Sequence, residues 1–235
     1  IHMFLTYNPV AGCLVHTGND PMARATNEAL NSARKMTTDE RWKAGHSFDE
    51  PQGPTVLARE ALEAIDGIVE VFSGRLTGVF YAETKDARGN VYPKMRLAFS
   101  ENGSDPHVIS LELAHEMTLQ LIQRITSVQP GQWLIIRPTI SPVERNGRMF
   151  ANHNCIVKDD QDQLLSPIPG LWKQAQAGAD EAAKKLMDMG IKEAKLINLT
   201  KAQSKLDFHR QLLDGIVQRF KMDAKPQSTS ETAFF

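Results

Sequence analysis

The spacing of apolar residues changes near residue 68 from a helical period to a period of two, and this change most constrains the fold. Residues 91–99 alternate almost without interruption, with apolar residues at the odd positions and Tyr92, Lys94 and Arg96 at even positions. Successive side chains of a strand point to opposite faces, so we expect one buried face and one basic, aromatic face. Residues 68–84, 107–113, 132–140 and 148–158 predict four further strands, and Gly74 and Gly78 mark places where the first could bulge or bend.

A helix is predicted over residues 114–128, where apolar residues recur at helical spacing until Pro130 and Gly131 end the pattern. The order is then a long coiled strand, two strands, a helix and two strands, which is the chain order of the OB-fold barrel. We therefore predict an α+β protein with a five-stranded OB-fold β-barrel over residues 68–160. Five strands and a helix also fit other α+β arrangements.

The segments on either side of the predicted barrel are helical or polar. Residues 1–67 predict an N-terminal elaboration with two short helices, the first capped by Asp20 before Pro21 and the second opened by Pro54. Residues 37–53 are polar and predict a loop. Residues 161–221 predict a helical appendage with helices at 180–189 and 201–220, and residues 222–235 a flexible tail. Residues 1–67 and 161–221 could elaborate the barrel or form a dimerisation element, which leaves a homodimer open.

Composition is that of a globular protein, with 41% hydrophobic and 23% charged residues and a formal net charge of -1. The middle is the basic part, since residues 68–158 hold 10 basic and 8 acidic side chains, whereas residues 1–67 hold 6 and 9. Apolar runs stay far below the roughly 18 residues of a membrane span, and no leader-like segment opens the chain. We therefore expect a soluble, cytoplasmic protein that does not bind membranes.

Motifs for catalysis or metal binding are incomplete. His115 and Glu116 begin a metalloprotease-like signature, but Leu119 stands where the second histidine is required. His153 and Cys155 would share a strand face, yet two ligands are too few for a zinc site. We therefore expect no enzymatic activity, no cofactor and no metal ion. An enzyme acting on nucleic acid through His115 or His153 is the third-ranked hypothesis.

The predicted strands repeatedly combine cations with flat aromatic side chains. Single-stranded nucleic acid requires both, because cations contact the phosphates and unpaired bases stack on rings. Strand aromatics more often pack half-buried than serve as stacking platforms, and strand cations usually form a solvated face. Their coincidence on several strands nevertheless favours nucleic-acid binding. The candidate binding residues are Arg75, Tyr81, Tyr92, Lys94, Arg96, Trp133, Arg137, Arg148 and Phe150.

The barrel order over roughly residues 66–160, followed by an appendage and a polar tail that ends in Phe234 and Phe235, resembles the single-stranded-DNA-binding proteins of bacteria and their phages. The resemblance implies an OB-fold that protects exposed strands during replication, recombination and repair, in a bacterial cell or a phage-infected host. It also implies that the terminal phenylalanines recruit replication or recombination proteins. The tail departs from the strongly acidic tails of that family, because residues 222–235 hold only Asp223 and Glu231 against Lys225.

The function predicted from the sequence is sequence-independent binding of single-stranded DNA through base stacking and phosphate contacts. The alternative is a protein-interaction or assembly module that does not bind nucleic acid and uses the barrel and the C-terminal helices to bind proteins.

Overall fold

The computed structural model describes residues 3–44, 53–100, 106–145 and 147–223. These residues form one eight-stranded sheet in the order β3-β2-β1-β6-β5-β4-β7-β8. Neighbouring strands are antiparallel, except that β1 and β6 are parallel. The strands are β1 (Phe4–Asn8), β2 (Cys13–His16), β3 (Ile68–Val69), β4 (Phe72–Lys85), β5 (Val91–Phe99), β6 (His107–Glu112), β7 (Trp133–Arg145) and β8 (Arg148–Lys158).

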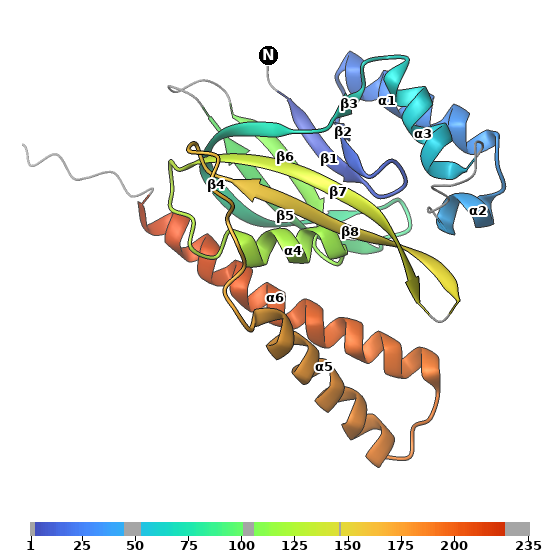
Figure 1. Cartoon of the computed structure of the whole chain (residues 1–235), viewed down its shortest axis with the longest axis vertical. Helices are drawn as coiled ribbons and strands as arrows, with labels where there is room; N and C mark the ends of the chain where they lie inside the picture. The colour runs from blue at the N-terminus through green and yellow to red at the C-terminus, as the bar shows by residue number, and fades with distance from the viewer. Residues whose placement is uncertain (1–2, 45–52, 101–105, 146, 224–235) are drawn as a thin grey trace, which may run out of the picture.

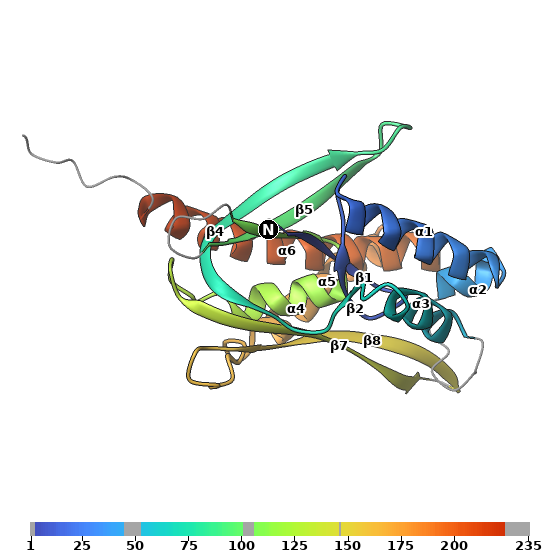
Figure 2. The same cartoon turned by 90° about the horizontal axis from the view of Figure 1, so that it is seen from above.

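The sheet curls into a half-barrel around β4 (Figures 1 and 2). Residues 72–75 of β4 pair with β7, and residues 76–85 pair with β5, so one strand joins the two halves of the curl. The register against β5 shifts between Leu76 and Gly78, which confirms the predicted bulge in this strand. A bulge increases the local twist and bends the strand, and it therefore lets β4 turn from one partner to the other.

The predicted five-stranded barrel is wrong. The five expected strands occur in the expected order, but the N-terminal segment adds β1, β2 and β3 to the same sheet. β1 pairs with the edge of β6, with Phe4 opposite Val108, and β8 remains the other edge strand. β1 and β2 are only five and four residues long, and so short a stretch of alternating residues predicts a strand poorly.

Helices cover both surfaces of the sheet in different places. α4 (Glu116–Arg124) and α6 (Ala194–Asp223) contribute to the main core with the inner face of the sheet, and α5 (Leu171–Asp188) lies along α6 (Figure 1). α1 (Pro21–Lys35) and α3 (Pro54–Glu63) pack against each other, and a second, smaller core joins β2 to α3. The predicted cap is confirmed, because Asp20 Oδ1 accepts a hydrogen bond of 2.8 Å from the backbone N–H of Ala23.

Several boundaries differ from the sequence prediction. α5 begins nine residues earlier than expected, at Leu171, and its buried positions after Leu171 are alanines, which give little apolar signal. β7 continues to Arg145 through the expected loop at 141–147, so β7 and β8 form a long hairpin. In the expected loop at 37–53 the structure contains α2 (Asp39–Ala44). Among the described helices, none is long and apolar enough to cross a membrane.

The turn between β1 and β2 packs against β7 and brings the two ends of the curl together. Asn8 Oδ1 accepts hydrogen bonds from the backbone N–H groups of Val10 and Ala11, at 3.0 and 2.8 Å. Gly12 follows with a φ of +70° and lies directly against Ile140 of β7. A side chain at this glycine would therefore be strained twice, by its backbone conformation and by overlap with Ile140.

We expect Gly12→Ala to lower the free energy of unfolding by about 2–5 kcal/mol, because a left-handed conformation costs about 1–2 kcal/mol and overpacking about 1–3 kcal/mol. Gly89→Ala is the matched control, since Gly89 has a φ of +83° and a methyl group at this position would have no atom within 4 Å. For Gly89→Ala, the free energy of unfolding should fall only by the cost of the left-handed backbone conformation, about 1–2 kcal/mol. Urea unfolding of both variants measures the difference, and equal losses would show that the contact with Ile140 does not hold the curl closed.

Candidate nucleic-acid interface

The bulge in β4 decides which side chains of this strand face outward. Before the bulge, Arg75 points outward while Leu76 is fully buried. The bulge inserts Thr77 without a partner on β5, so the alternation reverses after it. Val79 is buried, and Phe80 is 48% exposed. Phe80 therefore lies on the outer face of the sheet, although the even positions before the bulge point inward.

Tyr81, one of the predicted binding residues, lies on the inner side of β4 and not on the outer face with Arg75, so its placement in the binding surface is wrong. Its ring packs against the main core, and the guanidinium of Arg210 on α6 lies 3.1 Å from the ring centroid. The Tyr81 hydroxyl donates a hydrogen bond of 2.7 Å to Glu83. Tyr81 therefore helps to fix α6 against β4.

The Phe80 ring leans over Gly78 on the outer face of the sheet. A Cβ on Gly78 would come within 2.6 Å of the Phe80 ring and within 3.3 Å of Ala98 on β5. The absence of a side chain at Gly78, together with the small side chain of Ala98, leaves room for the ring at this position. An aromatic side chain this exposed on a sheet surface can serve as a stacking site for an unpaired base.

The even-numbered residues of β5 face outward beside Phe80, as the sequence predicted. Arg96 lies directly opposite Phe80, and Lys94 lies one position further along the same face. Lys94 forms an ion pair of 3.5 Å with Glu112 on β6, and its Nζ lies 6.0 Å from the centroid of the Tyr92 ring. We call Phe80, Tyr92, Lys94 and Arg96 the outer β4–β5 face.

Arg96 has the least compensated charge on this face. Its guanidinium lies 5.8 Å from the centroid of the Phe4 ring on β1. No carboxylate among the described residues pairs with it, and its Nε is buried without a hydrogen-bond partner. The guanidinium is therefore held between two strands bearing aromatic residues, Phe4 and Phe80, and its charge is available to an anion.

Tyr92 is positioned by the turn that follows β4. Its hydroxyl donates a hydrogen bond of 3.1 Å to Asp86, which raises the pKa of Tyr92. Hydrogen bonds from Asn90, both side chain and backbone, lower the pKa of Asp86. The ring of Tyr92 remains 38% exposed, so the turn fixes the hydroxyl and leaves the ring accessible.

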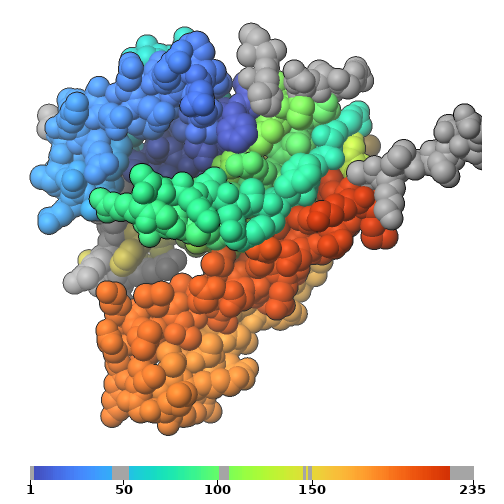
Figure 3. Space-filling model, turned by 180° about the vertical axis from the view of Figure 1, so that it is seen from behind, coloured from blue at the N-terminus to red at the C-terminus, as the bar shows by residue number. Residues whose placement is uncertain are grey.

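The outer β4–β5 face is not covered by the helices. Figure 3 shows this side of the molecule in space-filling form, where the green residues of β4 and β5 form a band across the surface between the blue N-terminal segment and the red-orange α6. The smaller core forms over β2, through Cys13 and Val15 with Ala58 and Leu62 of α3. The helices of the N-terminal segment therefore protect the far end of the sheet and leave β4 and β5 open.

A second group of predicted residues lies on the outer face of β7 and β8. Arg75 of β4 pairs directly with Trp133, and its Nη1 donates a hydrogen bond of 2.6 Å to the backbone carbonyl of Gly131. Trp133 is half-buried, and Arg137 and Phe150 are exposed. The backbone of Arg148 belongs to β8, but its side chain lies outside the described part of the chain, as do Phe234 and Phe235.

The two histidines considered as catalytic candidates meet inside the curl. A hydrogen bond of 2.7 Å joins the Tyr7 hydroxyl on β1 to Nδ1 of His153 on β8. The ring centroids of His115 and His153 are 4.8 Å apart. His115 caps α4, because its Nδ1 accepts a hydrogen bond of 3.3 Å from the backbone N–H of Met117. This cluster joins β1, α4 and β8 at the closing edge of the curl.

In the part of the chain that the structure describes, no three His, Cys, Asp or Glu side chains are placed to hold a metal ion. Burial raises the pKa of the Cys13 and Cys155 thiols to about 12. Both cysteines therefore stay protonated at neutral pH and are poor nucleophiles.

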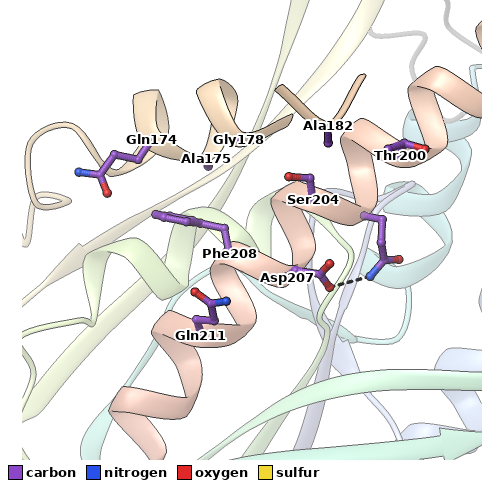
Figure 4. A pocket seen from close by; sticks show the side chains of 10 residues that line it. Gln174, Ala175, Gly178, Ala182, Thr200, Ser204, Asp207, Phe208 and Gln211 are labelled. Carbon is purple, nitrogen blue, oxygen red and sulfur yellow. Dashed lines mark hydrogen bonds between the residues drawn. The ribbon is translucent and has the colours of Figure 1, made fainter. Parts of the chain in front are cut away.

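A surface hollow with a volume of about 480 Å³ lies between α5 and α6 (Figure 4). Small residues such as Ala175 and Gly178 on α5 line it together with Ser204 and Phe208 on α6. Asp207 beside it accepts a hydrogen bond of 2.8 Å from Gln203 of the same helix. The sequence did not single out this hollow, and its described lining contains no uncompensated cation.

No protein-family model matches the chain, and neither curated proteins nor solved structures contain a match to it.

From the Tyr7, His115 and His153 cluster we expect the free energy of unfolding to fall in acid. Burial lowers the pKa of His115, so the unfolded chain takes up a proton at a higher pH than the folded one. The free energy of unfolding should therefore fall as the pH drops below about 6.5, and the fall should end below the pKa of folded His115. Tyr7, His153 and Glu116 surround this group.

His115→Asn tests the acid effect, because asparagine can still cap α4 but does not titrate. The variant should lose less stability than the wild type between about pH 7 and pH 5 in urea unfolding. A residual loss is expected, since burial also lowers the pKa of His209. Identical pH profiles for wild type and variant would contradict the prediction.

Proposed function

We propose that the protein binds single-stranded DNA without sequence specificity, through the outer β4–β5 face, and that it acts as a binding protein and not as an enzyme. The observation that carries the proposal is the exposed Phe80 ring, which lies over Gly78 and directly opposite Arg96 on the neighbouring strand. A base that stacks on Phe80 would place its phosphate within reach of the neighbouring guanidinium. Base stacking on an aromatic side chain contributes about 1–3 kcal/mol per base.

The arrangement fits a single strand better than a duplex. The two exposed aromatic residues of this face, Phe80 and Tyr92, offer ring faces, and only unpaired bases can lie against a ring. Glu112 lies beside Lys94 at 3.5 Å, which limits the positive field that a duplex backbone would require. The near-neutral chain, with a net charge of -1, likewise supports local contacts over long-range electrostatic attraction.

A protein-interaction module is the second candidate function, and the tip of the α5–α6 hairpin supports it. Exposed apolar side chains gather where the two helices are joined, at Met187, Met189, Leu196 and Leu199. An exposed apolar cluster of this kind can dock on a partner protein. If the chain bound no nucleic acid, this surface would become the leading site.

Phe80→Ala should weaken binding of a thymine oligonucleotide by about 1–3 kcal/mol, because it removes the stacking ring. Trp172→Ala is the matched control, since Trp172 is an aromatic residue of α5 that is 38% exposed and lies away from the sheet. Fluorescence anisotropy with a labelled oligonucleotide measures both affinities. Equal effects of the two variants, or equal binding of duplex and single-stranded DNA by the wild type, would count against the proposal.

Arg96→Ala should reduce the logarithmic salt dependence of binding by about 0.7, the value for one phosphate contact on a single strand. Lys94→Ala should reduce it less, because Glu112 already compensates part of the Lys94 charge. Lys185→Ala provides a control, since Lys185 forms an exposed ion pair of 2.8 Å with Glu181 on α5. Titrations between low and moderate salt give the slopes, and a larger effect of Lys94→Ala than of Arg96→Ala would contradict the charge assignment.

A further inference from the structure

The outer face of β7 and β8 carries a second set of uncompensated cations beside an aromatic ring. Arg137 is exposed and makes no hydrogen bond or ion pair with any described residue. Arg75 binds only the backbone carbonyl of Gly131, so its charge is also unneutralised, and it lies directly opposite Trp133. The combination of a ring and cations on one sheet face therefore occurs twice in the molecule.

A shallow depression of about 220 Å³ lies at the far end of this second face. Val71, Ile135 and Ile156 form its apolar floor, and Arg137 and Lys158 stand at its rim. Asp162 forms an ion pair of 2.7 Å with Lys158, which leaves Arg137 as the uncompensated cation of the depression. An apolar floor beside one available guanidinium suits a flat base with an attached phosphate.

β4 connects this depression to the outer β4–β5 face. The two hairpins lie on opposite sides of the curl, and β4 bends between them (Figure 2). Phe80 lies on the part of β4 that pairs with β5, and Arg75 on the part that pairs with β7. At about 3.3 Å per residue along a strand and about 4.8 Å between strands, the path from Phe80 through Arg75 to Arg137 measures about 35 Å.

We infer that one DNA strand continues from the outer β4–β5 face around the bend of β4 and onto the Arg75, Trp133 and Arg137 surface. This inference rests on the proposed function. Charge complementarity carries it, because Arg96, Arg75 and Arg137 follow one another along the path and have no carboxylate partner among the described residues. Trp133 supplies a second stacking position, between Arg75 and the depression.

Oligonucleotide length separates the two parts of the path. Site sizes on comparable single-strand binding surfaces run from about 4 to about 16 nucleotides. If the bases keep the spacing of a duplex strand, about 3.4 Å per nucleotide, a 4-mer covers about 14 Å and a 16-mer about 54 Å. Only the 16-mer therefore spans the whole path. We would measure binding of thymine 4-mers and 16-mers to the full chain, to Phe80→Ala, Trp133→Ala and Arg137→Ala, and to the control Lys185→Ala.

The expected result is one 16-mer bound per chain. Trp133→Ala should weaken its binding about tenfold, as one stacking contact predicts. Arg137→Ala should weaken it severalfold and reduce the salt slope by about 0.7. The 4-mer should respond to Phe80→Ala and not to Arg137→Ala. Lys185→Ala should change neither affinity, and thermal unfolding should confirm that each variant is folded.

Two results would overturn the continuous path while leaving the proposed function in place. Either Phe80→Ala weakens both oligonucleotides and Arg137→Ala weakens neither, or the wild type takes up two 16-mers per chain, one lost with each variant. Equal effects of Arg137→Ala on the 4-mer and the 16-mer would also contradict two successive subsites. If Phe80→Ala changes neither affinity, the proposed function itself fails.

Discussion

The register shift between Leu76 and Gly78 is the constraint on which the rest of the structure depends. It lets β4 leave β7 and continue along β5, so that a single strand holds the two halves of the curl together. It also reverses the alternation of the strand, which places Val79 in the core and Phe80 on the surface. One inserted residue, Thr77, therefore determines both the shape of the sheet and the chemistry of its outer side.

The two faces of the sheet have different roles: the inner face packs the core, and the outer face carries the candidate binding residues. The inner side is occupied by the main core, by α4 and α6, and by the Tyr7, His115 and His153 cluster. The outer side is covered over β2 and open over β4, β5, β7 and β8. The candidate binding residues therefore lie on the sheet face that contributes least to the packed core.

Local pattern predicted most of the individual elements and the outward direction of Tyr92, Lys94 and Arg96, because a regular strand alternates without exception. The local pattern did not predict that β1 joins the sheet. Its partner β6 lies about a hundred residues away, and the five residues of β1 carry no pattern that identifies this partner. The local pattern placed Tyr81 on the surface and did not select Phe80. A glycine in a strand indicates that a bulge can form nearby, but it does not identify the residue at which the bulge occurs. A shift of one residue then exchanges the two faces.

The parallel pairing of β1 with β6 has a consequence for the order in which the chain folds. The strands from β4 to β6 are neighbours in sequence and can form an antiparallel meander through short turns. Phe4 instead meets Val108, and Tyr7 meets His153, across separations of 104 and 146 residues along the chain. Closing loops of that length is slow and entropically unfavourable. We therefore expect the N-terminal hairpin, although it precedes these strands in the chain, to dock late, after the surface that it completes has formed.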